Sequence, residues 1–207
     1  MNILYYFCGA AAGYLIGCLN VAAILAHKKG FDIRSKGSHN AGASNALLTM
    51  GKGAAAASAL TDILKAFLPV WLLIHVIPLP EDCPHLPVLT GAAVIFGHMF
   101  PFWMQFRGGK GFASLLGLSL ALDWRLFLIM IGIIALMLFT VRYIVPATLT
   151  CTVLLPVWHY FRTNDWIDVL LLIAPGAVII YKHRENVRRI RSGTEFKFGK
   201  KPPKIPD

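Results

Sequence analysis

The sequence has few charged residues. Aspartate, glutamate, lysine and arginine make up only 14% of its 207 residues, whereas soluble proteins average about 25%. Apolar residues account for 57% of the chain, and the mean hydropathy is +0.63. This composition excludes an ordinary soluble domain and is typical of a polytopic membrane protein.

Cysteines are also few, and their positions argue against two kinds of site. Cys8, Cys18 and Cys151 lie in apolar segments, while Cys83 is isolated in a connecting segment. The sequence contains neither a Cys-x-x-Cys pair nor a Cys/His ligand spacing. The cysteine pattern therefore supports neither a disulfide framework nor a zinc site, and we expect no metal ion.

Acidic residues are half as many as basic ones, ten against twenty, which gives a formal net charge of +10. In a soluble protein this excess would indicate nucleic-acid binding. In an apolar chain it indicates basic loops on the cytoplasmic side of a membrane. We therefore expect the lipid bilayer, and not nucleic acid, as a partner. The N-terminus has no basic leader and no small-residue cleavage site, so residues 3–26 are interpreted as a retained span.

Seven apolar runs predict an all-α, polytopic membrane protein with seven transmembrane helices. The fourth run is short for a hydrocarbon layer about 30 Å thick, which leaves a tilted or partly re-entrant helix open. Residues 1–192 are expected to form a single membrane domain, and residues 193–207 a basic cytoplasmic tail. The runs are residues 3–26, 53–77, 86–105, 111–122, 125–141, 144–161 and 165–181.

Seven crossings place the two ends of the chain on opposite sides of the membrane. With the C-terminus inside, 17 of the 20 lysines and arginines fall on the cytoplasmic side, and Arg125 and Arg162 fall outside. The positive-inside rule then predicts an outer N-terminus and a cytoplasmic C-terminus. The segments after the first and third runs are also cytoplasmic in this topology.

The first cytoplasmic segment contains a stretch of small residues, 37–45, with the sequence Gly-Ser-His-Asn-Ala-Gly-Ala-Ser-Asn. Small side chains leave backbone N–H groups approachable. A nest of such groups, or the N-terminus of a following helix, binds anions. Taken alone, the stretch is equally well interpreted as an ordinary turn.

Two other cytoplasmic segments have a similar character. Residues 107–111 read Arg-Gly-Gly-Lys-Gly, and Met104 and Gly111 stand where a Walker A loop needs glycine and a hydroxyl, which argues against nucleotide hydrolysis. His183 and Asn186 share one face of a predicted helix, and a histidine is a common general base near neutral pH. We expect the three segments to meet on one face of the membrane and bind phosphate.

Asp62, Lys65 and His98 are ionisable residues that lie inside the apolar runs. Asp62 and Lys65 are three residues apart and are expected to pair with each other or with a neighbouring span. His98 is expected to orient a loop. Close helix packing is predicted at three glycines spaced four apart, Gly9, Gly13 and Gly17.

These segments, taken in order, resemble the bacterial acyl-phosphate:glycerol-3-phosphate acyltransferase family. The resemblance covers nearly the whole chain. It implies transfer of a fatty acyl group from acyl phosphate to the 1-hydroxyl of glycerol 3-phosphate, which gives lysophosphatidic acid. It also implies a monomer in the bacterial cytoplasmic (inner) membrane, with no cofactor, no metal and no acyl-CoA donor. The segments are residues 37–45, 62–65, Gly97-His98 with Pro101, 108–111 and 183–186.

The resemblance also implies roles for individual residues. The positions matched to substrate binding and transfer are Ser38, Lys110, His183 and Asn186. Those assigned to substrate or phosphate binding are Gly37, Asn40, Gly42, Ala43, Asn45, Gly108, Gly109, Gly111, Arg142 and Thr148. The supporting residues are Asp62, Lys65 and His98.

Two positions depart from the family pattern. Leu48 stands where an arginine usually contacts the glycerol phosphate, and Val145 lies where a serine-bearing turn is usual, so that only Thr148 keeps a hydroxyl. Loss of an arginine–phosphate contact costs about 1.5–3 kcal/mol. An altered acceptor or an inactive paralogue is therefore an open alternative. A small transporter for an anionic solute is another, because such proteins carry charged residues inside their spans.

Overall fold

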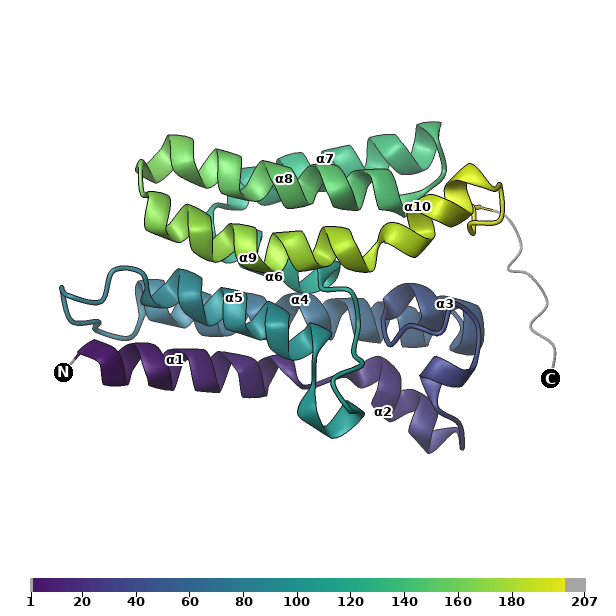
Figure 1. The fold of residues 1–207 in the computed structure, drawn as a ribbon, viewed down its shortest axis with the longest axis horizontal. Coiled ribbons are helices and arrows are strands. Elements are labelled where there is room, and N and C mark those ends of the chain that lie inside the picture. The colour runs from purple at the N-terminus through teal and green to yellow at the C-terminus, as the bar shows by residue number, and fades with distance from the viewer. Residues whose placement is uncertain (1, 200–207) are drawn as a thin grey trace.

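The computed structural model describes residues 2–199, and all regular secondary structure within them is helical, which confirms the all-α prediction. The helices run roughly along the long axis of a bundle (Figure 1). They are α1 (Asn2–Gly17), α2 (Val21–Lys28), α3 (Ala43–Met50), α4 (Lys52–His75), α5 (Leu86–Met99), α6 (Phe112–Leu122), α7 (Trp124–Thr140), α8 (Ile144–Thr163), α9 (Trp166–Lys182) and α10 (Arg184–Arg191), with short 3₁₀ turns η1 (Ile33–Ser35) and η2 (Phe102–Met104).

All seven predicted apolar runs are helical, but they differ in length. In the described part of the chain, five helical stretches are long and apolar enough to cross a membrane. Helices α6 and α7 are apolar but shorter. The five stretches are Ile3–Lys28, Lys52–His75, Leu86–Met104, Ile144–Thr163 and Trp166–Arg191.

Large apolar side chains cover the outer surface of the bundle. Ile3, Phe139 and Phe161 are each more than four-fifths exposed, at 84%, 87% and 82%. Monomeric soluble proteins rarely expose extended apolar patches, whereas apolar side chains that face lipid carry no free-energy cost of exposure to water. The surface therefore agrees with the composition in indicating an integral membrane protein.

The predicted close packing of the N-terminal glycines is confirmed. Helix α1 lies along α5 (Figure 1). A Cβ at Gly13 or Gly17 would meet the backbone carbonyl of Thr90 or Val94 on α5. Only glycine lets the two helix backbones approach this closely.

The first predicted run is divided into two helices. Residues 18–20 separate α1 from α2. Trp103 and Lys65 donate hydrogen bonds to two carbonyl oxygens of this break, at 2.8 and 2.6 Å. Because a buried unpaired carbonyl is costly, these side chains allow the chain to change direction inside the protein.

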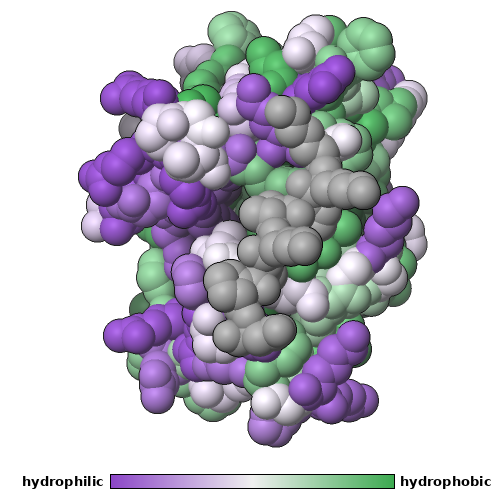
Figure 2. Space-filling model, turned by 90° about the vertical axis from the view of Figure 1, so that its right-hand side faces the viewer, coloured by the Kyte–Doolittle hydropathy of each residue, from purple (hydrophilic) through white to green (hydrophobic). Residues whose placement is uncertain are grey.

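Helix α3 was not among the predicted helices. It begins inside the small-residue stretch, with Gly42 as its N-cap, and ends at Gly51, whose φ is +89°. Figure 2 looks onto the end of the molecule at which α3 and α10 lie, and hydrophilic residues are spread over that end. The small residues thus lie at a helix N-terminus on a polar end of the bundle.

Candidate active site

A cavity of about 1230 Å³ lies between α3, α4, α6, α8 and the α9–α10 junction. The three segments predicted to bind phosphate all contribute to its wall, so their predicted convergence is present. Ser38 comes from the first segment, Lys110 from the second, and His183 and Asn186 from the third. Other predicted site residues in the wall are Gly37, Asn40, Asp62, Gly42, Ala43, His98, Gly111 and Thr148.

Lys110 is tied to the C-terminal part of the chain through a chain of polar contacts. Its ammonium donates to Oδ1 of Asn186. Nδ2 of Asn186 donates to Oε1 of Glu195 at 2.6 Å, and Nε of Arg189 donates to Oε2 of Glu195 at 2.7 Å. Arg189 therefore pairs with the Glu195 carboxylate directly, and Lys110 is connected to the same carboxylate through the Asn186 amide, which fixes the position of the Lys110 ammonium.

The charge of Lys110 is sensitive to pH near neutrality. Burial, with a smaller contribution from the Arg189 guanidinium, lowers the pKa of Lys110 to about 8. The ammonium is thus mostly protonated at pH 7 and loses its charge just above. A phosphate placed beside it would favour the charged form.

His183 joins α9 to α10 and is buried, with 5% of its surface exposed. Its Nδ1 lies 2.8 Å from the carbonyl oxygen of Ile179. Because a carbonyl oxygen only accepts, Nδ1 carries the proton, and Nε2 of the neutral ring keeps a lone pair. In this tautomer His183 can accept a proton through Nε2.

Asn45 does not line the cavity; its side chain holds the backbone of the first segment by hydrogen bonds. Its Oδ1 accepts the N–H of Ser38 at 2.7 Å, and its Nδ2 donates to the carbonyls of Ile33 and Lys36 at 2.8 and 3.0 Å. Gly37 has φ +64°, and a Cβ there would collide with the Asn45 side chain. Asn45 is therefore a scaffold residue in this structure, and it presents Ser38 to the cavity.

The first turn of α3 forms part of the cavity wall. Gly42, Ala43 and Ser44 all line the cavity. The first N–H groups of a helix lack intrahelical partners, and the positive end of the helix dipole favours an anion there. Nδ2 of Asn20 donates to the carbonyl of Ala41 at 2.9 Å, which anchors the chain just before this turn.

Gly108 and Gly109 do not line the cavity. Their N–H groups donate to the carbonyls of Met99 and His98, both at 3.1 Å, so these two N–H groups are not directed at a substrate. A Cβ at Gly109 would collide with the His98 ring. The glycines permit the close approach of this loop to α5, and that approach positions the following Lys110.

Asp62, Lys65 and His98 form one buried cluster, and Asp62 pairs with Lys65 as predicted. Oδ1 of Asp62 lies 2.6 Å from Nζ of Lys65 and 3.1 Å from Nδ1 of His98. Lys65 also donates to the carbonyl of Leu19, and the other side of the His98 ring faces Gly109. The cluster thus connects the α1–α2 break to the loop that carries Lys110.

The two departures from the family pattern both line the cavity. Leu48 and Val145 are part of its wall, as is Thr148, whose hydroxyl donates to the carbonyl of Ile144 at 3.1 Å. Arg142 is exposed and outside the wall. The structure therefore does not bring Arg142 together with the other predicted binding residues.

Asn20, Arg189 and Glu195 support this site but were not predicted from the sequence. Asn20 stands inside an apolar run, where an amide signals a break in a helix. Arg189 lies three residues after Asn186, on the same helix face. Glu195 lies two residues after Gly193 in the tail. No sequence pattern marks it as a site residue, because only the folded chain brings it to Asn186.

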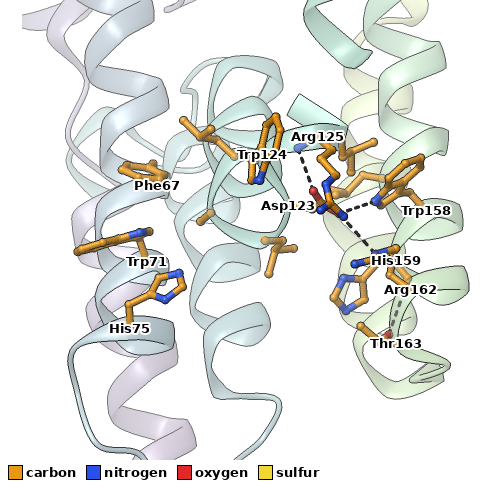
Figure 3. Close-up of a pocket in the computed structure, with 15 residues that line it drawn as sticks. Phe67, Trp71, His75, Asp123, Trp124, Arg125, Trp158, His159, Arg162 and Thr163 are labelled. Carbon is orange, nitrogen blue, oxygen red and sulfur yellow. Dashed lines mark hydrogen bonds and ion pairs between the residues drawn. The ribbon is translucent and has the colours of Figure 1, made fainter. Parts of the chain in front are cut away.

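A second cavity, of about 590 Å³, lies at the opposite end of the bundle (Figure 3). Aromatic residues of α4 and α8 line it, among them Trp71 and Trp158. Asp123 accepts the indole N–H of Trp158 at 3.0 Å, and Arg162 lies 3.6 Å from the same carboxylate. None of the predicted site residues lines this cavity.

The chain is similar to proteins of known family. A family model described as glycerol-3-phosphate acyltransferase matches residues 7–193. The glycerol-3-phosphate acyltransferase of Mesorhizobium japonicum is 38% identical over 91% of this chain and 94% of the relative. Glycerol-3-phosphate acyltransferase 1 of Oceanobacillus iheyensis is 35% identical over 96% of this chain and 99% of the relative.

Two solved structures share the fold. The glycerol 3-phosphate form of PlsY, an integral membrane glycerol 3-phosphate acyltransferase, superposes with a TM-score of 0.85 at 30% identity, over 94% of this chain and 96% of that one. The lysophosphatidic acid form of PlsY gives a TM-score of 0.80 at the same identity, over 94% and 95% of the two chains. The resemblance inferred from the sequence motifs is thereby confirmed: this chain belongs to the glycerol-3-phosphate acyltransferase family.

Proposed function

We propose that this membrane acyltransferase moves a fatty acyl group from acyl phosphate to the 1-hydroxyl of glycerol 3-phosphate, giving lysophosphatidic acid and inorganic phosphate. The observation that carries the proposal is the meeting of Ser38, Lys110, His183 and Asn186 in one cavity. Acyl phosphate is already activated, since phosphate is a good leaving group. The protein then needs no covalent nucleophile, but it must hold two anionic substrates together.

In the proposed reaction, the 1-hydroxyl oxygen attacks the acyl carbon. The new ester bond forms, and the bond from the acyl carbon to the phosphate oxygen breaks. Lys110 and the first turn of α3 stabilise the departing phosphate. Ser38 binds substrate, and Asn186 positions the Lys110 ammonium. The hydroxyl proton passes either to Nε2 of His183 or to a phosphate oxygen.

The apolar part of the cavity supports an acyl substrate. Four aliphatic side chains of α4, α6 and α7 line the same cavity as the polar residues. An acyl chain therefore lies between the helices while its phosphate meets Lys110. The four side chains are Ile63, Leu116, Ile131 and Ile134.

For the topology, we propose seven crossings of the bacterial inner membrane by a monomer. The cavity then faces the cytoplasm, and the N-terminus lies outside. The excess of lysine and arginine near the cavity end supports this orientation. The start of α1 and helix α10 lie at opposite ends of the bundle (Figure 1). Helix α6, with 11 residues, is only about 16 Å long, which is shorter than the hydrocarbon layer. In this proposal the loop that carries Lys110, just before α6, therefore reaches into the membrane from the cytoplasmic side.

A second candidate function is the same transfer to a different polyol phosphate. The observation that favours it is Leu48, which lines the cavity where the family usually has an arginine. A leucine makes no hydrogen bond to a phosphate. Comparison of several polyol phosphates as acceptors distinguishes the two candidates.

The experiment is reconstitution of the purified chain in vesicles with acyl phosphate and glycerol 3-phosphate. We expect equal amounts of lysophosphatidic acid and inorganic phosphate. Acyl-CoA serves as the control donor and should give no product. Intact acyl phosphate with no product, for every acceptor, rejects the proposal, and flux of an unchanged anion into the vesicles would indicate a transporter instead.

A further inference from the structure

A cluster of two histidines and two aspartates lies at the end of the bundle opposite the active site. His85 precedes α5, His159 belongs to α8, and Asp165 and Asp168 lie at the start of α9. The α4–α5 and α8–α9 connections both lie at this end (Figure 1), and His85 of the first contacts Asp165 and Asp168 of the second. From the geometry of this cluster, we propose that it binds a divalent transition-metal ion of the zinc type.

Three ligand atoms converge on one point. Nδ1 of His85 lies 3.1 Å from Oδ1 of Asp168 and 3.3 Å from Oδ2 of Asp165. All three residues offer a ligand atom within 4.8 Å of the others. Zinc bonds of about 2.0–2.2 Å in tetrahedral geometry place ligand atoms roughly 3.4 Å apart. The two nitrogen–oxygen separations are therefore close to those of a three-ligand zinc site.

The remaining oxygen atoms of the two carboxylates are held by other groups. Oδ1 of Asp165 accepts the N–H groups of Ile167 and Asp168, at 2.9 and 3.2 Å, as the N-cap of α9. Oδ2 of Asp168 lies 3.1 Å from Nε2 of His159. Because a carboxylate only accepts, His159 donates this bond. Each carboxylate thus directs one oxygen to His85 and has the other fixed, as outer-shell partners fix metal ligands.

The charge of the cluster also favours a cation. Among residues 2–199, the ion pairs formed by Asp165 and Asp168 are with histidines, and no lysine or arginine pairs with them. The Asp168 side chain is only 10% exposed. One ring N–H of His85 makes one good hydrogen bond, so it cannot satisfy two carboxylates equally. A divalent ion bound by all three satisfies both.

The choice of metal follows from the ligands. An imidazole nitrogen with two carboxylate oxygens suits zinc, whereas calcium and magnesium prefer oxygen ligands alone. Three protein ligands leave a fourth position for water. His159 also borders the aromatic cavity beside Trp158 (Figure 3), so the metal site lies against that cavity. Binding there would clamp the α4–α5 connection to the α8–α9 turn.

The test uses the untagged full chain in detergent, stripped with a chelator and titrated with zinc, calcium or magnesium by calorimetry. We expect one equivalent of zinc, and a higher melting temperature when it is bound. His85→Gln and Asp168→Asn should lose zinc binding, and His159→Gln should weaken it about tenfold. Asp165→Asn keeps an oxygen for the α9 cap and should also bind zinc less tightly.

His75→Gln and Glu81→Gln are the matched controls, because these exposed residues lie at the same end but outside the cluster. Both should bind zinc as the unchanged chain does. The proposal is overturned if the unchanged chain takes up no zinc, which requires no variant to fold. It is also overturned if His85→Gln and Asp165→Asn bind zinc normally, or if calcium binds in preference to zinc.

Discussion

The polar clusters at the two ends of the bundle carry mainly charges of opposite sign. At the active-site end, Lys110 and Arg189 are linked through Asn186 and Glu195 beside a helix N-terminus. At the other end, Asp165 and Asp168 face histidines. One end therefore suits anions and the other suits a cation.

Helix α9 connects the two regions. Asp165 caps its start, and His183 follows its end. Its 17 residues span about 26 Å, close to the thickness of the hydrocarbon layer. Helix α9 thus carries the acidic cluster at its start and borders the large cavity at its end, and its length keeps the two regions apart. Changes at one end should therefore leave the chemistry at the other intact.

The largest expected effect concerns the active-site end. Lys110→Ala removes the ammonium that we propose stabilises the departing phosphate, and turnover should fall about 1000-fold. The measurement is lysophosphatidic acid formation in vesicles. Lys52→Ala is the control, since Lys52 is exposed and outside the cavity wall, and it should keep full turnover. Full activity of Lys110→Ala would remove Lys110 from the mechanism.

Gly109→Ala should have the next largest effect. The added Cβ collides with the buried His98 ring and displaces the loop that carries Lys110. A shift of about 1 Å can cost about 100-fold in rate. Gly132→Ala on α7 is the matched control, because a Cβ there meets no atom within 4 Å. Equal turnover in the two variants would contradict the proposed packing role.

Leu48→Arg tests whether the leucine in the cavity wall, which stands where the family usually has an arginine, weakens acceptor binding. A guanidinium at this position should bond the acceptor phosphate and lower the KM for glycerol 3-phosphate about tenfold. Leu48→Met changes shape without adding charge and should leave the KM unchanged. An unchanged KM in the arginine variant would place the acceptor elsewhere in the cavity.

The pKa of Lys110, lowered to about 8 by burial, predicts a pH dependence of binding. The ammonium is lost as the pH rises through this value. The acyl phosphate, whose phosphate group is proposed to meet Lys110, keeps its double negative charge over the same range. Its dissociation constant should therefore increase about tenfold between about pH 7 and pH 9. Calorimetry checks this, and Lys110→Arg, which stays charged, should show a flat profile.

The smallest expected effect is at the opposite end. Asp165→Asn keeps the α9 cap and lies far from the active-site cavity. Its turnover should stay within about twofold of the unchanged chain at saturating substrate. A large loss of turnover, with the melting temperature preserved, would show that the two ends are coupled.

Much of the fold could be predicted from composition and spacing. The seven apolar runs are all helical, and the glycine series of α1 packs against α5 as expected. The division of the first run was not predicted, because it depends on Lys65 and Trp103 from distant segments. Helix α3 was missed since its small polar residues have the composition of a turn.

The motifs of the site could be predicted, but the spatial arrangement of their side chains could not. The membrane class, the family and the three segments that line the cavity could be predicted from the sequence, because hydropathy and local motifs are carried by neighbouring residues. The folded structure was needed to show that Asn45 supports the loop while Leu48 lines the cavity. It also joined Glu195 to Asn186 and His85 to Asp168. Such pairings depend on how distant helices pack, and no local pattern along the chain encodes them.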